Sequence, residues 1–231
     1  MMPNQQTDNI IDPLSVDSVI FGFDEAKLKV LLIKRAIEPA FGMWALPGGF
    51  IRYDEDIADA ATRVLKERTG VENLYMEQLG TFGKIDRFPE RRVITIVYYA
   101  LIKPGQYQIN AGPDASDAGW FDLNELPKLP FDHKLIIEAA LARLRRKVKY
   151  KPIGFNLLAD KFPLLHLQEL YEAIYGIEFD KPNFRRKIMK MNLLVPLNEK
   201  QRGVPHRSAR LYKFDKERYD KLAEKGFIFE I

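Results

Sequence analysis

The fold is decided by the stretch Trp44-Ala45-Leu46-Pro47-Gly48-Gly49-Phe50 and the segment that follows it. The proline and the paired glycines are typical of a tight turn, because glycine adopts backbone conformations that other residues avoid. From about Asp54 to Thr69 apolar residues recur at helical spacing, and Gly70 then supplies a C-cap signal. The stretch therefore predicts a glycine-rich turn that leads into an amphipathic helix.

Strand patterns lie on both sides of this turn and helix. Runs rich in Val, Ile, Leu and Phe predict strands at 16–23, 28–34 and 93–101, the first two joined as a hairpin through Asp24-Glu25-Ala26-Lys27. Apolar residues at helical spacing over 136–148 predict a helix that closes a first domain, residues 1–150. The expected fold class is α+β.

The pattern changes after residue 150. Two helices are predicted, over 164–175 and from Asp180 to about Met191. Gly176 ends the first helix, and Asp180 is a good N-cap for the second. Two short apolar runs, 193–195 and 211–214, then surround a basic loop. Helix, turn, helix and β-wing is the order of a winged helix-turn-helix, which we expect over residues 151–231.

Composition excludes several classes of protein. The chain has 231 residues, 46% hydrophobic and 29% charged, which argues against collagen-like, coiled-coil and wholly disordered chains. Cysteine is absent, which excludes a disulfide framework, thiolate zinc ligation and a cysteine nucleophile. We expect no signal peptide and no membrane span, and therefore a cytoplasmic location.

The charge is unevenly distributed. The net charge is +4, but Lys181 to Lys213 contains ten Lys or Arg and a single acid, Glu199, which makes +9 for the segment and −5 for the rest. A basic segment of this kind is typical of a surface that contacts a polyanion. A solvated charged surface is the alternative, and composition alone does not choose between them.

The turn and helix resemble the Nudix box, G-x5-E-x7-R-E-U-x-E-E-x-G-U, where U is aliphatic. The matching residues are Gly49, Glu55, Arg63, Leu65, Glu67, Gly70 and Val71. The resemblance covers roughly residues 10–150 and implies the Nudix fold, an α/β/α sandwich with a mixed sheet.

The box departs from the family where catalysis needs it. Nudix hydrolases hold divalent cations with carboxylates on one helix face, and hard cations require oxygen ligands. Here the three positions are Val64, Glu67 and Arg68, so two carboxylates are missing and one is replaced by a cation. We therefore expect no catalytic residue, no metal and no cofactor.

Each of these side chains also has a structural interpretation. Val64 is expected to pack against the sheet, and Glu67 to pair with Arg63, with a ligand hydroxyl as the alternative partner of Glu67. Arg68 is expected to pair with Glu67 or Glu72 on the surface. Its alternative is to point into the former metal site in place of the missing cation.

The C-terminal part resembles the winged helix of Nudix-related transcriptional regulators of the NrtR and AraR types. The resemblance is carried by Phe162, Leu167-Gln168, Tyr171–Gly176, Asp180-Lys181, Asn183–Lys187 and Ala209–Tyr212. Pro163 departs from it, because the family often has a capping threonine there. The resemblance implies a Nudix-like domain that senses a metabolite and a tail that binds double-stranded operator DNA, as a homodimer because operators usually present two half-sites.

Polar side chains on the second predicted helix suit the major groove, and basic residues of the predicted wing suit the DNA backbone. The candidate DNA-binding residues are Asn183, Arg185, Arg186, Lys187, Lys190, Arg202, Arg207 and Arg210, with His206 beside them on the wing. Phe184, Ile188 and Met191 are expected to face the core of the tail domain.

By resemblance the effector is a sugar such as L-arabinose or an ADP-ribose-like nucleotide. The segments Glu77–Arg87 and Phe131-Asp132-His133 resemble regulators of the AraR type more than those of the NrtR type, which favours a sugar as effector. Arg35, Arg52, Arg68 and Arg87 could neutralise a diphosphate instead. The candidate effector-binding residues are Arg35, Pro47, Gly48, Gly49, Phe50, Glu67, Arg68, Lys84, Asp86, Arg87 and His133. For His133, a hydrogen-bonded structural role is favoured over a ligand contact.

The leading interpretation is a ligand-responsive transcriptional regulator, and among regulators a repressor is favoured. A Nudix hydrolase acting on a nucleoside diphosphate derivative is the alternative. RNA binding is disfavoured, because no aromatic-rich stacking surface is visible in the sequence.

Overall fold

The computed structural model describes residues 14–203 and 208–229, and the chain divides into two compact units. The first unit holds Val30–Ala100, Tyr107–Ala140 and the chain up to Phe21, and the second holds Gly22–Lys29, Leu101–Gln106 and the chain from Leu141 on. The division falls within helix α2 (His133–Tyr150). The domain boundary that the sequence places at residue 150 stays a prediction.

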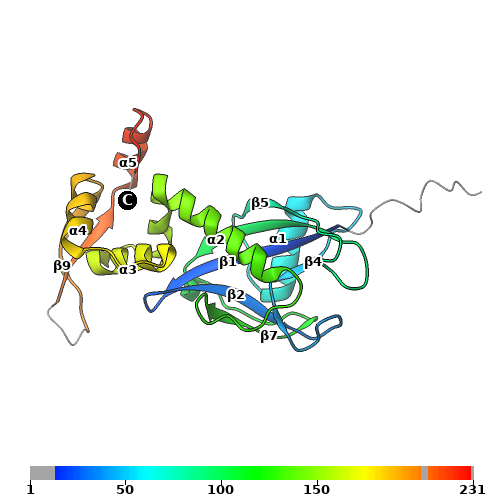
Figure 1. The fold of residues 1–231 in the computed structure, drawn as a ribbon. Helices are drawn as coiled ribbons and strands as arrows, with labels where there is room; N and C mark the ends of the chain where they lie inside the picture. The colour runs from blue at the N-terminus through cyan, green and yellow to red at the C-terminus, as the bar shows by residue number, and fades with distance from the viewer. Residues whose placement is uncertain (1–13, 204–207, 230–231) are drawn as a thin grey trace, which may run out of the picture. The chain divides into compact units, whose positions relative to one another are not determined.

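The first unit is built around a mixed seven-stranded sheet (Figure 1). Its path runs β3-β2-β1-β6-β5, with β4 paired to β1 and β7 paired to β2. The strands are β1 (Leu14–Asp24), β2 (Lys27–Arg35), β3 (Trp44–Ala45), β4 (Gly48–Phe50), β5 (Glu77–Phe82), β6 (Ile94–Ile102) and β7 (Ala115–Asp122). The three predicted strands are confirmed as β1, β2 and β6. The sequence did not indicate β5 and β7, because both are only partly buried and poor in β-branched residues.

Helix α1 (Ile57–Thr69) is the helix predicted after the turn, and it ends at Gly70, whose φ of 73° is left-handed. Its buried face packs in one cluster with Val16 of β1 and with Ile96 and Tyr98 of β6. Helix α1 and the first half of α2 flank the sheet (Figure 1), which gives the expected α/β/α sandwich.

The second unit has the order of a winged helix. Its elements are η2 (Pro152–Leu157), β8 (Phe162–Pro163), α3 (Leu164–Tyr175), α4 (Lys181–Lys190), β9 (Leu194–Lys200), β10 (Arg210–Phe214) and α5 (Lys216–Ala223), and a short turn, η1 (Pro104–Gln106), also belongs to this unit. The three strands pair in the order β8-β10-β9. Both predicted helices are confirmed, whereas α5 was not expected. Gly176 ends α3 with a φ of 70°, and the Asp180 carboxylate accepts the backbone N–H of Asn183 at 3.0 Å at the start of α4.

Aromatic side chains form much of the core of this second unit. The ring of Phe155 stacks on that of Phe214 with centroids 4.2 Å apart, and Phe229 packs edge-on against Phe155. On α4, Phe184 and Ile188 are buried as expected, and Met191 just beyond the helix is half-buried. Among the described residues, no helix combines the length and the apolar character needed to cross a membrane.

Candidate ligand cavity and nucleic-acid interface

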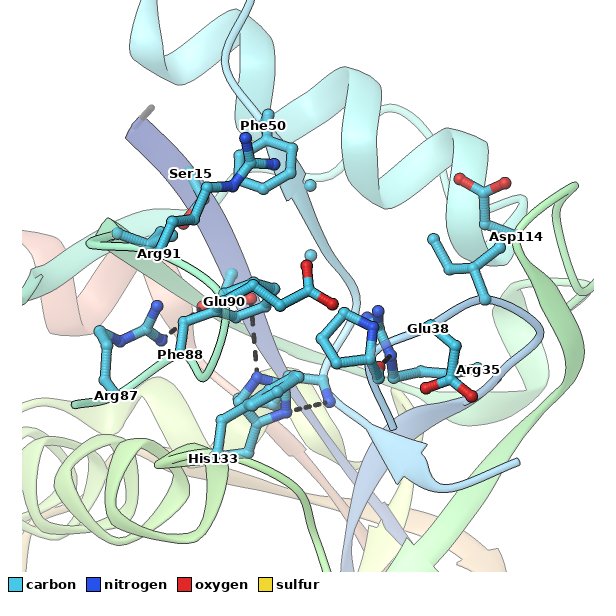
Figure 2. Close-up of a pocket in the computed structure, with 18 of the residues that line it drawn as sticks. Ser15, Arg35, Glu38, Phe50, Arg87, Phe88, Glu90, Arg91, Asp114 and His133 are labelled. Atoms are coloured by element: carbon cyan, nitrogen blue, oxygen red, sulfur yellow. Dashed lines mark hydrogen bonds and ion pairs between the residues drawn. The ribbon is translucent and has the colours of Figure 1, made fainter. Parts of the chain in front are cut away.

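A cavity of about 240 Å³ opens in the first unit beside the glycine-rich turn. Figure 2 shows Arg35 and Asp114 on one side of it and Arg87 and Arg91 on the other, with His133 below. Seven of the predicted effector-binding residues line this cavity: Arg35, Gly48, Gly49, Phe50, Arg68, Arg87 and His133. The structure thus brings together residues that are far apart in the sequence.

The floor of the cavity is a buried network of charges. The Arg87 guanidinium donates to both carboxylate oxygens of Asp132, at 3.0 and 2.8 Å, and to Asp17 Oδ2 at 3.4 Å. Asp17 Oδ2 also accepts the hydroxyl of Thr95 at 2.8 Å. Arg87 is therefore held by two acids of the protein.

His133 makes the structural hydrogen bond that was favoured for it. The backbone N–H of Leu46 donates to His133 Nδ1 at 3.0 Å, which ties the start of α2 to the glycine-rich turn. Burial lowers the pKa of His133, although the nearby carboxylates of Asp17 and Asp132 oppose the shift. The imidazole is therefore neutral at physiological pH.

Glu67 pairs with Arg63, as expected, and with a second arginine. Arg63 Nη1 donates to Glu67 Oε2 at 2.9 Å, and Arg52 Nη2 donates to Glu67 Oε1 at 3.2 Å. Arg63 also holds Glu55, with Nε at 2.7 Å from Glu55 Oε2. The hydrogen bonds from Arg63 are the largest cause of the low pKa of Glu55, about 2.

Arg68 corrects an expectation. It does not pair with Glu67 or Glu72 on the surface, but lines the cavity and forms an ion pair with Asp114. Its Nε also donates to the Gly48 carbonyl at 3.3 Å. The surface prediction was wrong because Asp114, 46 residues further along the chain, is brought beside Arg68 only by folding.

Gly112 explains how Asp114 reaches this position. A Cβ on Gly112 would lie 1.6 Å from the Glu67 carbonyl oxygen, so only glycine can approach the end of α1 so closely. The Gly112 N–H donates to the Arg68 carbonyl at 3.2 Å. The loop before β7 is thereby docked on α1.

The residues of the box do not fit a divalent cation, although the Nudix fold family implies one. Val64 is buried in the core cluster as expected, and both carboxylate oxygens of Glu67 accept from arginines. Arg68, at the third position, carries a positive charge and is paired with Asp114. Within the described ranges no three His, Cys, Asp or Glu side chains gather in a way that could hold a metal ion.

Four predicted effector-binding residues do not line the cavity: Pro47, Glu67, Lys84 and Asp86. Pro47 is buried, and its carbonyl accepts from the backbone of Ser18. Lys84 and Asp86 are exposed on the loop that precedes Arg87. Arg52 also lies outside the lining. Effector contacts by Pro47, Glu67, Lys84 and Asp86 stay predictions.

Further lining residues were missed by sequence reasoning: Ser15, Asp17, Ile37, Glu38, Pro39, Leu46, Phe88, Glu90, Arg91, Val93, Asp114 and Phe131. A polar residue inside an apolar strand was the available signal for Asp17. Ser15 lies on β1 as well, Val93 directly precedes β6, and the remaining members lie in loops. Two aromatic residues of the lining carry a cation on one face: the guanidinium of Arg91 lies 4.7 Å from the centre of the Phe50 ring, and that of Arg35 lies 5.6 Å from the centre of the Phe131 ring.

The second unit presents basic side chains on α4. Every candidate on this helix is exposed: Asn183, Arg185, Arg186, Lys187 and Lys190. Phe184 and Ile188 anchor the opposite face in the core. Arg186 Nη2 donates to Asn183 Oδ1 at 2.6 Å, so these two side chains are positioned together.

The wing carries the remaining candidates. Arg202 follows β9 and Arg210 begins β10 opposite Lys200, and both arginines are exposed. Arg207 and the neighbouring His206 lie outside the described residues. Glu199, the one acid of the basic segment, accepts Lys161 Nζ on both oxygens at 2.8 Å, so its charge is compensated.

Two family models match the chain in succession. The NUDIX domain matches residues 12–142, and the NrtR DNA-binding winged helix domain matches residues 154–214. This arrangement defines the class of Nudix-related transcriptional regulators. The ADPR responsive transcriptional repressor NtrR of Acinetobacter baylyi is 34% identical over 220 residues, which cover 94% of this chain and 87% of the relative. The chain belongs to the NrtR family of Nudix-related regulators.

Solved structures agree with this assignment. The crystal structure of Shewanella oneidensis NrtR complexed with a 27mer DNA is 36% identical with a TM-score of 0.71, over 87% of this chain and 93% of that one. The NUDIX domain of the same protein complexed with ADP ribose is 35% identical with a TM-score of 0.56, over 62% and 94%. The ADP-ribose pyrophosphatase of Methanocaldococcus jannaschii is 42% identical over 125 residues, 54% of this chain and 70% of that relative.

Proposed function

We propose that this chain is a DNA-binding repressor whose Nudix domain binds ADP-ribose or a closely similar nucleotide as effector and does not hydrolyse it. The observation that carries the proposal is the set of arginines that line the cavity, Arg35, Arg68 and Arg91, with Arg87 held by Asp132 and Asp17 at its floor. Guanidinium groups recognise phosphate oxygens with paired hydrogen bonds, and they do so without a metal ion.

The electrostatics of Arg35 support an anionic ligand. Burial, and then the positive charge of Arg68, lower the pKa of the Arg35 guanidinium, although the carboxylates of Asp17, Asp114 and Glu38 oppose the shift. A diphosphate between these two cations would relieve their repulsion. A neutral sugar offers no such compensation, and the names of the relatives above support ADP-ribose and give no support to L-arabinose.

The missing catalytic carboxylates support the absence of hydrolysis. Val64 and Arg68 occupy two of the three positions that hold cations in Nudix hydrolases, and arginines engage the remaining Glu67. Purified protein with magnesium should therefore release products from ADP-ribose no faster than a protein-free control. Turnover of about 1 per second or more would contradict this part of the proposal.

The winged helix supports binding to operator DNA, and we further propose that a homodimer binds two half-sites. The test is fluorescence anisotropy with a labelled duplex from upstream of the chain's own gene and random duplex as competitor. ADP-ribose and L-arabinose are titrated separately. We expect specific binding whose affinity changes with ADP-ribose and not with L-arabinose. Equal affinity for operator and random duplex at several salt concentrations would refute the regulator.

A further inference from the structure

His133 presents a single hydrogen-bond donor to the cavity. Its Nδ1 accepts the Leu46 backbone N–H, so the neutral imidazole carries its proton on Nε2. Nε2 lies 4.0 Å from Asp17 Oδ1, and the two side chains are only 5% and 9% exposed. This separation is too long for a direct hydrogen bond between them. The Nε2–H group is therefore available to a third group.

Asp17 presents a matching acceptor. Its Oδ2 already accepts from Thr95 and Arg87, which leaves Oδ1 on the side of His133. Oδ1 lies so close to Gly48 that a Cβ on this glycine would be 2.1 Å away. Gly48, which pairs with Asp17 between β4 and β1, therefore keeps Oδ1 uncovered at the wall of the cavity.

We infer that Asp17 and His133 recognise one ribose hydroxyl of the bound nucleotide. The hydroxyl oxygen accepts from His133 Nε2–H, and the hydroxyl proton is donated to Asp17 Oδ1. Both roles are needed at once, and a hydroxyl group is the simplest ligand group that is donor and acceptor together. The inference rests on the proposed function, because it names the part of an ADP-ribose-like effector that these two residues select.

Burial makes this pair selective. A polar site built to bond a hydroxyl rejects an analogue that lacks it, because the buried donor and acceptor are then left unpaired. The Arg87–Asp132 ion pair holds Asp17 from one side, and the Leu46 amide holds His133 from the other. The two groups are thus positioned before the ligand arrives.

The test is isothermal titration calorimetry of the full chain with ADP-ribose and with a series of analogues that each lack one ribose hydroxyl. We expect one analogue to bind roughly tenfold to a hundredfold more weakly than ADP-ribose, and the others to bind nearly as well. This measurement needs no variant of the protein. Equal affinity of every analogue would overturn the inference while leaving the proposed effector intact. Absence of ADP-ribose binding would overturn the proposed function and the inference together.

A variant pair assigns the effect to His133. To His133→Phe, the analogue that binds the wild type weakly should bind as well as ADP-ribose does. The variant lacks the Nε2–H donor that distinguishes the two ligands. Arg68→Gln, in the same cavity, is the matched control. It should bind both ligands more weakly, while the ratio of the two affinities stays that of the wild type. Thermal unfolding confirms that each variant is folded. An unchanged ratio in a folded His133→Phe would exclude His133 from hydroxyl recognition.

Discussion

At the scale of single residues, Arg63 connects the start of the Nudix box to the helix of the box. It donates to Glu55, to Glu67 and to the carbonyl of Phe50 at 3.1 Å, so the turn, the loop and α1 share one guanidinium. In Nudix hydrolases the corresponding helix carries metal-binding carboxylates. Here the retained carboxylates of Glu55 and Glu67 accept hydrogen bonds from arginines.

The low pKa of Glu55 makes part of the stability dependent on pH. The pKa of this carboxyl is about 2 in the folded chain, against an ordinary value of 4.5, and the hydrogen bonds from Arg63 are the largest cause. Its contribution is therefore fully present above pH 4.5 and is lost as the pH falls from 4.5 towards 2. In urea unfolding across this range, Glu55→Gln should lower stability at neutral pH and flatten the acid dependence. The exposed Glu125→Gln serves as control, and a variant curve parallel to that of the wild type would contradict the assignment.

Arg68 should contribute to effector affinity through its charge. Arg68→Gln is expected to weaken ADP-ribose binding about tenfold to a hundredfold, because a charged hydrogen bond to phosphate is lost. Arg52→Gln removes an arginine outside the cavity lining and should change affinity little. Calorimetry with EDTA and with magnesium should give the same affinities. A requirement for magnesium would show that a metal ion, and not Arg68, neutralises the ligand.

The loop before β7 acts at the scale of elements, because it docks on the end of α1. Besides the contact of Gly112, the Asn110 N–H donates to the Thr69 carbonyl at 3.0 Å. The loop carries Asp114 to the cavity, so its attachment to the helix shapes the cavity as well as the fold.

Gly112→Ala should therefore destabilise the fold strongly, although the substitution adds only one methyl group. We expect a loss of about 1–3 kcal/mol in the free energy of unfolding, because the added Cβ meets backbone that cannot move aside easily. In Gly105→Ala the new Cβ meets nothing within 4 Å, which makes it the matched control. Equal unfolding midpoints for the two variants would argue against tight docking of this loop.

Helix α4 is expected to supply phosphate and base contacts. The double variant Arg186→Ala and Lys187→Ala should weaken operator binding and reduce the slope of log affinity against log salt by about 1.8, for two lost phosphate contacts. Lys216→Ala with Arg218→Ala removes the same charge from exposed positions of α5 and should leave the slope closer to that of the wild type. If the α4 variant keeps the wild-type slope, these two residues do not contact the backbone.

At the scale of the whole molecule, the cavity proposed for the effector and the helix proposed for DNA binding lie in separate compact units of one chain. If ADP-ribose changes operator affinity by a given factor, the operator must change ADP-ribose affinity by the same factor, because binding free energies are linked. Anisotropy with effector present and calorimetry with duplex present should return equal factors. Unequal factors would indicate a further linked equilibrium, such as a change in association state between the two assays. Analytical ultracentrifugation should find two chains on each operator.

The sequence by itself determined the local features. These features depend on residues that lie close together along the chain, so their spacing can be read directly. They are the offsets between Gly49 and Val71, the helix ends at Gly70 and Gly176, and the cap at Asp180. Burial of Val64, Phe184 and Ile188 followed from helical periodicity in the same way.

Only the tertiary structure decided the cavity. Asp114 meets Arg68, Asp132 meets Arg87, and Asp17 faces His133, all across long separations that local spacing does not encode. Strand pairing and loop docking bring these groups together at the cavity, where the buried Asp17 and Arg87 need partners because unpaired charge is costly away from water. Arg68 turned inward to Asp114 rather than outward to the neighbouring carboxylates because folding places Asp114 beside it.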